Sequence, residues 1–525
     1  MRFFNTEGPV NCAEHYCLPP LTRLDLDEVS ELIGRQKYFL LHAPRQTGKT
    51  TCLLALAKRL EQGGKYHAVY ANIEGAQAHR EDIDKGIVTV VTDIATWAHD
   101  LAGDLTATPL AQEVLATTPP ASALGVFLSR WCQQLDKPLV LMLDEVDALV
   151  GDTLISLLRQ LRAGYPKRPR QFPHSLILCG VRDIQDYRIH SQAQKMIITG
   201  GSAFNIKAKS LRLGDFSQPE VNALLAEHTA ETGQIFSREA RDLVWELTSG
   251  QPWLVNALAY RTCFESRAGR DRGQPITAEM IQQAKEDLIL ARVTHLDQLA
   301  DKLQEQRVRR VIEAILAGDQ TAEIMPPDDI TYVRDLGLIK TEGQLTIANR
   351  IYQEVIPREL TFSTQLTIAE QPAWYVLPDG RLDLAKLLAA FQQFFRENSE
   401  IWLERFDYKE AGPQLLMQAF LQRIVNGGGR VEREYGLGRR RTDLLVLWRY
   451  SGGVQRAVIE LKILRDSWEK TLAAGLTQTS QYADRCAADE AHLVIFDRRP
   501  DRSWAEKIWQ RNERYQDWAI SVWGV

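Results

Sequence analysis

The sequence has no hydrophobic stretch long enough to cross a membrane. Its apolar runs stop well short of the roughly 18 residues that a spanning helix needs. The first residues, Met1–Asn5, are followed by Glu7 and Pro9 rather than by the apolar stretch of a secretion signal. We therefore expect a cytoplasmic protein with no membrane partner.

Cysteine is scarce, and its spacing suggests neither a zinc site nor a disulfide framework. The seven cysteines include no C-x-x-C pair and no zinc-ligand spacing. Cys12 and Cys17, close to His15, form the only cluster, and we do not favour a metal there. We expect all seven to be free thiols, as in a reducing cytosol.

Internal repeats and low-complexity segments are also missing. The chain has 525 residues, of which 45% are hydrophobic and 25% charged, so it should be globular and should divide into about three domains. The net charge of −5 identifies no partner, because a local basic patch can lie within an acidic total.

The most informative stretch is Tyr38–Leu60, where an apolar strand, a loop and a helix follow one another. The loop APRQTGKT matches G-x-x-x-x-G-K-[ST] except that Ala43 replaces the first glycine. Gly48 lets the backbone amides curl around a phosphate, Lys49 reaches the β- and γ-phosphates, and Thr50 offers its hydroxyl to Mg²⁺. We therefore predict that ATP and Mg²⁺ bind here. The predicted contacts of this loop are Ala43, Pro44, Arg45, Gln46, Thr47, Gly48, Lys49, Thr50 and Thr51.

A second apolar run, KPLVLMLDE, ends in the acids Asp144 and Glu145. After a phosphate-binding loop, this pattern indicates a buried strand that delivers Asp144 to the Mg²⁺ shell, while Glu145 polarises the attacking water. A third strand, Ser175–Cys179, leads to Arg182, which either senses the γ-phosphate or forms a surface ion pair. Apolar strands alternating with helices predict an α/β fold with a parallel sheet covered on both faces.

The pattern turns helical from Phe216, and the segment TSGQPW, which contains Gly250 and Pro252, ends one helix and begins another. Helices at Gln306–Ala317 and Asp328–Leu336, followed by a hairpin signal at Glu342-Gly343, predict a winged helix. Its presumed recognition helix has no basic run, so we favour packing against the ATPase over DNA binding. The predicted domains are an ATPase domain (1–215), a helical lid (216–300), a winged-helix-like domain (301–362), a linker (363–398) and a C-terminal domain (399–525).

Four segments, HAPRQTGKTT, LVLMLDE, LCGVRD and SGQPWLVNALA, together resemble the AAA-like ATPases of prokaryotes, which are related to archaeal-type and STAND signalling NTPases. The resemblance covers roughly residues 10 to 360. In those families a Gly-x-Pro element of the lid faces the nucleotide, which implies that role for Gly250 and Pro252. If copies assemble into a homo-oligomer, Arg159 or Arg162 would be the arginine finger.

The C-terminal region predicts a β-hairpin that carries two facing acids. Because strand side chains alternate, Glu460 and Lys462 share one face. A turn centred between Ser451 and Gly452 would pair Asp443 with Glu460. Directly opposed carboxylates repel, so we predict a divalent cation between them. The predicted elements are a helix near Gln414–Val425 and strands at Arg430–Tyr435, Thr442–Trp448 and Val454–Ile463.

Two carboxylates and a lysine around Mg²⁺ are suited to phosphodiester hydrolysis. Further on, Gln478 and Tyr482 lie four residues apart, on one face of a helix. These residues resemble the RecB-like branch of the PD-(D/E)xK nucleases, with Asp443 after a longer spacing than usual, ELK as the E-x-K motif and QTSQY as the Q-x-x-x-Y motif. The resemblance implies catalytic roles for Asp443, Glu460, Lys462, Gln478 and Tyr482. The first acid of the family is either Glu410 or Glu434.

The region around these motifs is basic, which favours a nucleic-acid partner, in the first instance DNA. We weigh two functions. One is an ATP-regulated nuclease, for which the resemblance implies a role in phage defence or mobile-element control. The other is a nucleotide-switched signalling or scaffold protein whose nuclease-like domain only binds nucleic acid. The basic and aromatic residues are Arg423, Arg430, Arg433, Arg439, Arg440, Arg441, Trp448 and Trp468.

Overall fold

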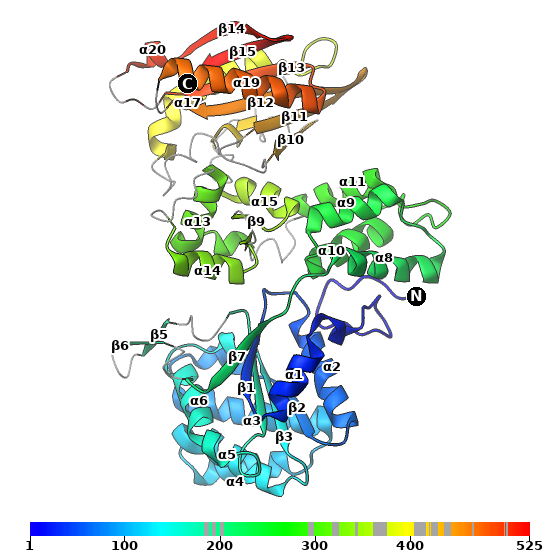
Figure 1. The fold of residues 1–525 in the computed structure, drawn as a ribbon, viewed down its shortest axis with the longest axis vertical. Coiled ribbons are helices and arrows are strands. Elements are labelled where there is room, and N and C mark those ends of the chain that lie inside the picture. Colours follow the sequence, from blue (N-terminus) through cyan, green and yellow to red (C-terminus); the bar gives the residue numbers. More distant parts are fainter. Residues whose placement is uncertain are drawn as a thin grey trace. The chain divides into compact units, whose positions relative to one another are not determined.

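The computed structural model divides into two compact units, which Figure 1 draws and which we describe one at a time. The first comprises Met1–Leu288 with Arg334–Gly337, and the second comprises Ile289–Val333 with Leu338–Val525. The residues described are 1–182, 188–191, 196–199, 204–291, 299–317, 325–341, 345–360, 375–403, 416–418, 420–421, 429–434, 443–464, 467–497, 499 and 502–525. Within these ranges, no helix is both long and apolar enough to cross a bilayer.

The first unit is built on a parallel sheet with the strand order β2-β3-β4-β1-β7. The parallel α/β sheet predicted from the sequence is therefore confirmed. We did not predict β7, because its sequence KAKSLR is largely polar and lies at the partly exposed edge of the sheet. The strands are β1 (Tyr38–His42), β2 (His67–Asn72), β3 (Leu139–Asp144), β4 (Ser175–Gly180) and β7 (Lys207–Arg212).

Helices cover both faces of this sheet because its strands are apolar on both sides. In β1, Tyr38 and Leu40 join the core formed with α3, α4, α5 and α6, whereas Phe39 and Leu41 join the core formed with α1 and α2. The helices are α1 (Leu26–Gly34), α2 (Lys49–Gln62), α3 (Ile83–Ala102), α4 (Ala107–Thr117), α5 (Pro120–Gln134) and α6 (Gly151–Gly164). The region predicted as a lid continues with α8 (Gln218–Thr232), α9 (Arg238–Thr248), α10 (Pro252–Tyr260) and α11 (Ala278–Leu290).

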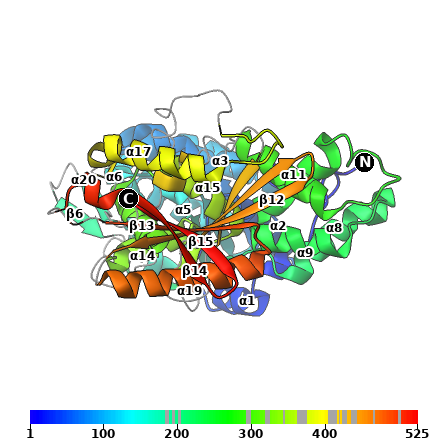
Figure 2. The ribbon, with the colours of Figure 1, turned by 90° about the horizontal axis from the view of Figure 1, so that it is seen from above.

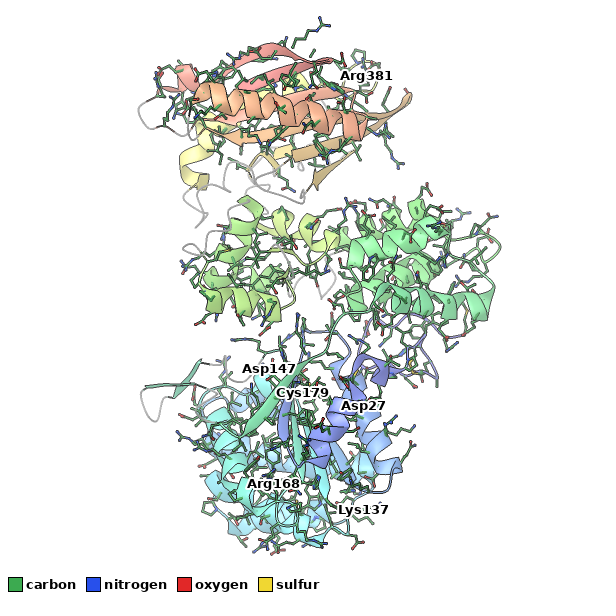
Figure 3. All side chains as sticks on the ribbon, in the orientation of Figure 1. Asp27, Lys137, Asp147, Arg168, Cys179 and Arg381 are labelled. Carbon is green, nitrogen blue, oxygen red and sulfur yellow. A yellow bond between two sulfur atoms is a disulfide. The ribbon has the colours of Figure 1, made fainter. Side chains whose placement is uncertain are left out.

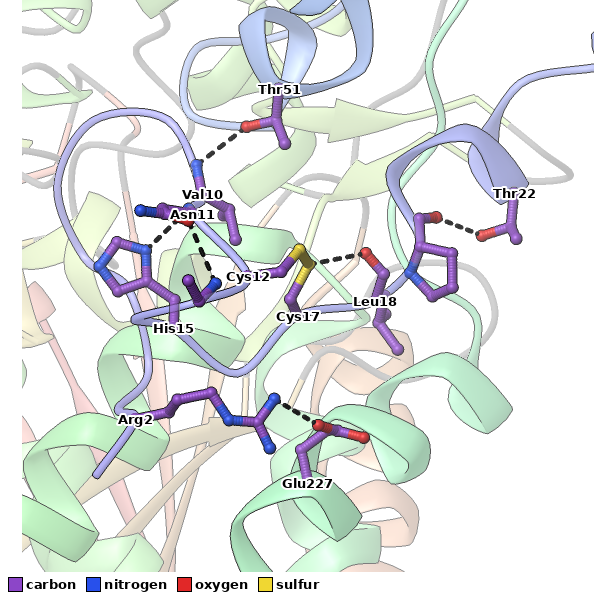
Figure 4. Close-up of a disulfide and its surroundings, with 12 residues drawn as sticks. Arg2, Val10, Asn11, Cys12, His15, Cys17, Leu18, Thr22, Thr51 and Glu227 are labelled. Carbon is purple, nitrogen blue, oxygen red and sulfur yellow. Dashed lines mark hydrogen bonds and ion pairs between the residues drawn. A yellow bond between two sulfur atoms is a disulfide. The ribbon is translucent and has the colours of Figure 1, made fainter. Parts of the chain in front are cut away.

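The N-terminal segment contains a disulfide between Cys12 and Cys17, so the prediction of seven free thiols is wrong for this pair (Figure 4). The chain turns back at Asn11, whose carbonyl accepts hydrogen bonds from the amides of Glu14 and His15 at 3.0 and 2.7 Å. That turn brings the two cysteines together, with Cα atoms 5.2 Å apart. The five other cysteines are free, as predicted.

The second unit begins with helices and a short hairpin in the order predicted for residues 301–362. Ile339 pairs with Ile347 in antiparallel register, and the turn at Glu342-Gly343 lies outside the described residues. The winged-helix assignment stays a prediction. The elements are α13 (Gln306–Ala317), α14 (Pro327–Asp335, whose last two residues cluster with the first unit), β8 (Ile339–Lys340), β9 (Thr346–Ile347) and α15 (Arg350–Leu360).

The C-terminal sheet has the order β10-β11-β12-β13-β15-β14. Neighbours β10, β11 and β12 are antiparallel, whereas β13 runs parallel to β12 and β15. Figure 2 shows this sheet between α17 and α19, and α19 connects β12 to β13. The elements are α17 (Leu384–Leu403), β10 (Gly429–Glu434), β11 (Asp443–Tyr450), β12 (Gly453–Ile463), α19 (Trp468–Cys486), β13 (Glu490–Phe496), α20 (Trp504–Lys507), β14 (Trp509–Tyr515) and β15 (Trp518–Gly524).

The predicted linker, residues 363–398, includes most of α17, and this helix packs in the C-terminal core. Leu387 and Phe391 of α17 are fully buried against residues of β11 and β12. Pro378 and Gly380 lie in a tight turn immediately before this core, in which Gly380 N donates to Leu377 O at 2.9 Å. Residues 361–374 are outside the described part, and the helix predicted near Gln414–Val425 is helical at 416–418 and 420–421.

Candidate nucleotide site and a second polar cluster

The predicted phosphate-binding loop lies between β1 and α2, as its mechanism requires. Gly48 has φ +88°, a left-handed conformation that favours glycine, and α2 begins at the next residue. The buried Lys49 ammonium donates hydrogen bonds of 3.0 Å to the carbonyls of Ala43 and Pro44. The loop therefore curls around its own lysine.

Asp144 lies at the end of β3 and is completely buried. Its Oδ2 accepts a hydrogen bond from the Thr50 hydroxyl at 2.7 Å and one from the Tyr70 hydroxyl at 3.0 Å. The structure thus joins Thr50 and Asp144, as predicted, and adds Tyr70. Burial, and then the charge of Asp144, raises the pKa of Tyr70. The sequence signal for Tyr70 was a hydroxyl within a buried strand, which needs a polar partner.

Glu145 follows Asp144 in a left-handed conformation, with φ +59°. Its amide donates to Asp144 Oδ1 at 3.0 Å. Burial, and then the nearby charge of Asp147, raises the pKa of the Glu145 carboxyl. A strained backbone and a raised carboxyl pKa are both common among residues that accept protons in active sites.

Glu145 and Arg182 lie at the same edge of the sheet, where the parallel strands end. In Figure 3, Asp147 and Cys179 mark this edge, whereas Lys137 and Arg168 mark the opposite one. Arg182 is half-buried two residues after β4, and the amide of its neighbour Val181 donates to Asp147 at 3.2 Å.

The region predicted as a lid is anchored at its start through Gly250. Gly250 has φ +80°, its carbonyl accepts from Phe216 N at 2.9 Å, and an added Cβ would lie 1.9 Å from Phe216 O. No larger residue fits this approach. Pro252 occupies the first turn of α10, where its missing amide costs nothing.

A pocket of about 740 Å³, its open mouth included, lies between the loop, the lid and the N-terminal segment. Of the predicted residues, Gln46, Thr47, Gly48, Thr51 and Pro252 line it. Arg45 is exposed and is not part of the lining. Sequence reasoning missed the N-terminal residues of the lining, because their position depends on contacts between residues that are distant in sequence. These residues are Asn5, Thr6, Glu7, Gly8, Val10, Tyr16, Cys17, Leu18, Pro20 and Arg23.

The groups around the phosphate-binding loop fit a magnesium nucleotide, although Lys49, Thr50 and Asp144 do not line this pocket. Thr50 and Asp144 present the hydroxyl and carboxylate oxygens that Mg²⁺ prefers, and they already contact each other. Lys49 and the first amides of α2 are the groups that hold phosphates. The cation, when bound by Thr50 and Asp144, would neutralise charge on the phosphates.

The family described as the AAA-like domain matches residues 27–356. The chain belongs to this AAA-like domain family. Among solved structures, the chain is similar to the Walker-type ATPase PABY2304 of Pyrococcus abyssi. The TM-score is 0.46 and the identity 13%, over 67% of this chain and 99% of that one. No protein with a curated function matches the chain.

Two further solved structures show weaker similarity to the AAA-like chain. For Cdc6p of Pyrobaculum aerophilum, the TM-score is 0.35 and the identity 14%, over 65% of this chain and 95% of that one. For RuvB of Thermotoga maritima, a Holliday junction branch migration motor, the TM-score is 0.32 and the identity 12%, over 63% and 90%.

The C-terminal sheet of this AAA-like protein lies beyond the family match and brings predicted residues together. Asp443 pairs with Glu460 in the β11–β12 register, as the predicted turn required. Glu460 and Lys462 share the face that α19 covers. There the Lys462 ammonium donates hydrogen bonds to Glu460 Oε1 and to Gln478 Oε1 of α19. Glu460 is completely buried. Tyr482, one turn beyond Gln478 on α19, is almost completely buried.

A third acidic residue occupies the same row of the sheet. In the β10–β11 register Glu434 pairs with Asp443, so the row across β10, β11 and β12 reads Glu434, Asp443, Glu460. The side chains of Glu434 and Asp443, and the whole of Glu410, lie outside the description. Among the described side chains, no group of three acids, histidines or cysteines is placed to hold a metal ion. The cation between Asp443 and Glu460 stays a prediction.

The predicted nucleic-acid surface is only partly described. Trp448 is buried and donates to Gly380 O at 2.9 Å, so it belongs to the core and not to a binding surface. Trp468 packs edge-on against Trp509, with ring centroids 5.0 Å apart. The side chains of Arg423, Arg430, Arg433, Arg439, Arg440 and Arg441 are outside the described part.

Proposed function

We propose that this AAA-like protein binds and hydrolyses ATP with Mg²⁺, and that its nucleotide state controls Mg²⁺-dependent cleavage of nucleic acid, first of all DNA, by the C-terminal domain. In the ATPase site, Lys49 and the loop hold the phosphates, Glu145 polarises the attacking water and Arg182 senses the γ-phosphate. Gly250 and Pro252 connect this site to the lid, which with the winged-helix-like domain passes the state on.

Hydrolysis is tested by comparing wild type with Lys49→Ala and Glu145→Gln. We expect Lys49→Ala to lose nucleotide binding, because the phosphates lose the positive charge of the Lys49 ammonium. Glu145→Gln should retain ATP but turn it over at least 100-fold more slowly, since removing a positioned general base typically costs 10²–10⁴-fold. Equal turnover by Glu145→Gln and wild type would refute the role of Glu145.

The cleavage proposal depends chiefly on one observation: Lys462 joins Glu460 of β12 to Gln478 of α19. Asp443 and Glu434 stand in the same row of the sheet, which supports Glu434 over Glu410 as the first acid. Acids of this row would hold Mg²⁺, which lowers the pKa of a bound water and screens the phosphate. Lys462 would position the nucleophile, oriented by Gln478 and Tyr482.

Cleavage is tested with supercoiled and linear plasmid in Mg²⁺ or Mn²⁺. Glu460→Gln keeps the size of the side chain and removes its charge, so we expect at least a 100-fold loss of cleavage. Glu513→Gln, on the edge strand β14, is the matched control and should cleave like wild type. Full activity in Glu460→Gln would exclude this site.

One observation favours the signalling or scaffold alternative: Glu460 already has a cationic partner in Lys462. In that case light scattering should show nucleotide-dependent assembly, with no cleavage in any metal. An assembly would also make Arg159 and Arg162, both exposed on α6, the arginine fingers to test. A role in phage defence or mobile-element control would be dismissed if Lys49→Ala protected infected cells as well as wild type.

A further inference from the structure

Arg23 reaches the phosphate-binding loop from the N-terminal segment. It ends the short 3-10 helix η1 (Pro20–Arg23), just before α1. Its guanidinium donates through Nη1 to the carbonyl of Thr47 and through Nη2 to the carbonyl of Gly214. Nη1 lies 3.1 Å from the position that a Cβ on Gly48 would take. One side chain thus contacts the loop and the segment that leads into the lid.

The same guanidinium also contacts the lid anchor. Its Cζ lies 4.8 Å from the centroid of the Phe216 ring, a cation–π contact. Phe216 is the residue whose amide donates to Gly250 O. A continuous series of contacts therefore runs from Thr47 through Arg23 and Phe216 to Gly250.

The chemistry at Arg23 is costly, which argues against a purely structural role. Burial lowers the pKa of the guanidinium, because the charge is removed from water. Its Nε is buried and has no hydrogen-bond partner, which is destabilising for a donor. Arg23 also lines the pocket. Buried, incompletely satisfied groups beside a pocket are more often kept for function than for stability.

We infer that Arg23 is a positioning residue that holds the phosphate-binding loop and couples it to the lid. This inference rests on the proposed nucleotide binding. The fork of the guanidinium reaches two carbonyls while its Cζ lies over the Phe216 ring. A lysine ammonium is a point charge and cannot do both. Losing Arg23 therefore releases Thr47, and with it Gly48 and Lys49, from the lid.

The test compares full-length wild type, Arg23→Met and Arg23→Lys. The control is Arg35→Met, which removes an exposed arginine paired with Glu31 on α1. Titration calorimetry gives Kd for ATP and for ADP, turnover at saturating ATP gives kcat, and thermal unfolding is followed with and without nucleotide. We expect Arg23→Met to weaken ATP binding about tenfold and to lower kcat. Arg23→Lys should restore less than half of the loss in affinity and less than half of the loss in kcat. Arg35→Met should change neither quantity.

Three results would overturn the inference. If Arg23→Met had the Kd and kcat of wild type and differed only by a lower unfolding temperature in the absence of nucleotide, the role of Arg23 would be structural. Full rescue by Arg23→Lys would reduce it to charge alone. Failure of wild type to bind either nucleotide would refute the proposed nucleotide binding itself, and the inference with it.

Discussion

The two halves of the protein each bury a carboxylate completely but pair it differently. Asp144 is held by the hydroxyls of Thr50 and Tyr70, and the nearby lysine, Lys49, donates to backbone carbonyls. Glu460 is bound directly by the ammonium of Lys462. A carboxylate held by neutral hydroxyls keeps its charge for a cation, whereas a carboxylate in an ion pair is stable without one. The arrangement at Asp144 is therefore suited to binding Mg²⁺. At Glu460, a metal ion must either displace Lys462 or share the carboxylate with it.

The largest difference should appear when Lys462 is removed. Lys462→Met removes the ammonium that pairs with the buried Glu460. Breaking a buried ion pair in this way lowers the free energy of unfolding by about 3–5 kcal/mol. We expect that loss in the denaturant unfolding of the C-terminal unit. The double variant Glu460→Gln with Lys462→Met removes both charges and should recover most of it. A Lys462→Met protein as stable as wild type would contradict the comparison.

A smaller effect is expected from Tyr70→Phe, which sharpens the comparison within the ATPase half. It removes one of the two hydroxyls that hold Asp144, and a hydrogen bond to a charged group is worth about 1.5–3 kcal/mol. Chemical denaturation measures the loss. Tyr66→Phe is the control, because the Tyr66 ring packs in the same core as Tyr70. Equal stabilities of Tyr70→Phe and wild type would show that Thr50 alone suffices.

The smallest change in stability should come from Lys49→Ala. The Lys49 ammonium donates its hydrogen bonds to carbonyls of its own loop and not to a carboxylate, so we expect a loss of at most about 1 kcal/mol in the free energy of unfolding. Its effect should fall on ATP, with affinity at least 100-fold weaker, or about 2.7 kcal/mol. A Lys49→Ala protein destabilised as much as Lys462→Met would remove the distinction between the two lysines.

Much of the fold was predictable where the signal was local. Apolar strands and a loop of fixed spacing identified β1, α2 and β3, and the turn at Ser451–Gly452 fixed the pairing of Asp443 with Glu460. The alternation of a strand was enough to place Glu460 and Lys462 on one face. These features depend only on periodicity and on neighbouring residues.

The rest depends on contacts between distant residues, which periodicity does not encode. The polar edge strand β7 has no apolar pattern. The helix α17 packs in the C-terminal core although most of it lies within the predicted linker. Tyr70 and Arg23 belong to the candidate nucleotide site through hydrogen-bond partners that lie 74 and 24 residues away in the sequence. The disulfide between Cys12 and Cys17 likewise depends on a turn that their spacing alone did not reveal.

Plasmid cleavage by the full chain decides whether the nucleotide state controls the C-terminal domain. It is measured in Mg²⁺ with ATP, with ADP and without nucleotide. The proteins compared are wild type, Lys49→Ala, Glu145→Gln and Glu460→Gln. We expect the rate of wild-type cleavage to differ between ATP and ADP, and Lys49→Ala to cleave at one rate in all three conditions. Glu145→Gln should keep the cleavage rate that wild type has with ATP, and Glu460→Gln should not cleave. Cleavage that ignores the nucleotide in wild type, or no cleavage while ATP is still hydrolysed, would contradict the proposed function.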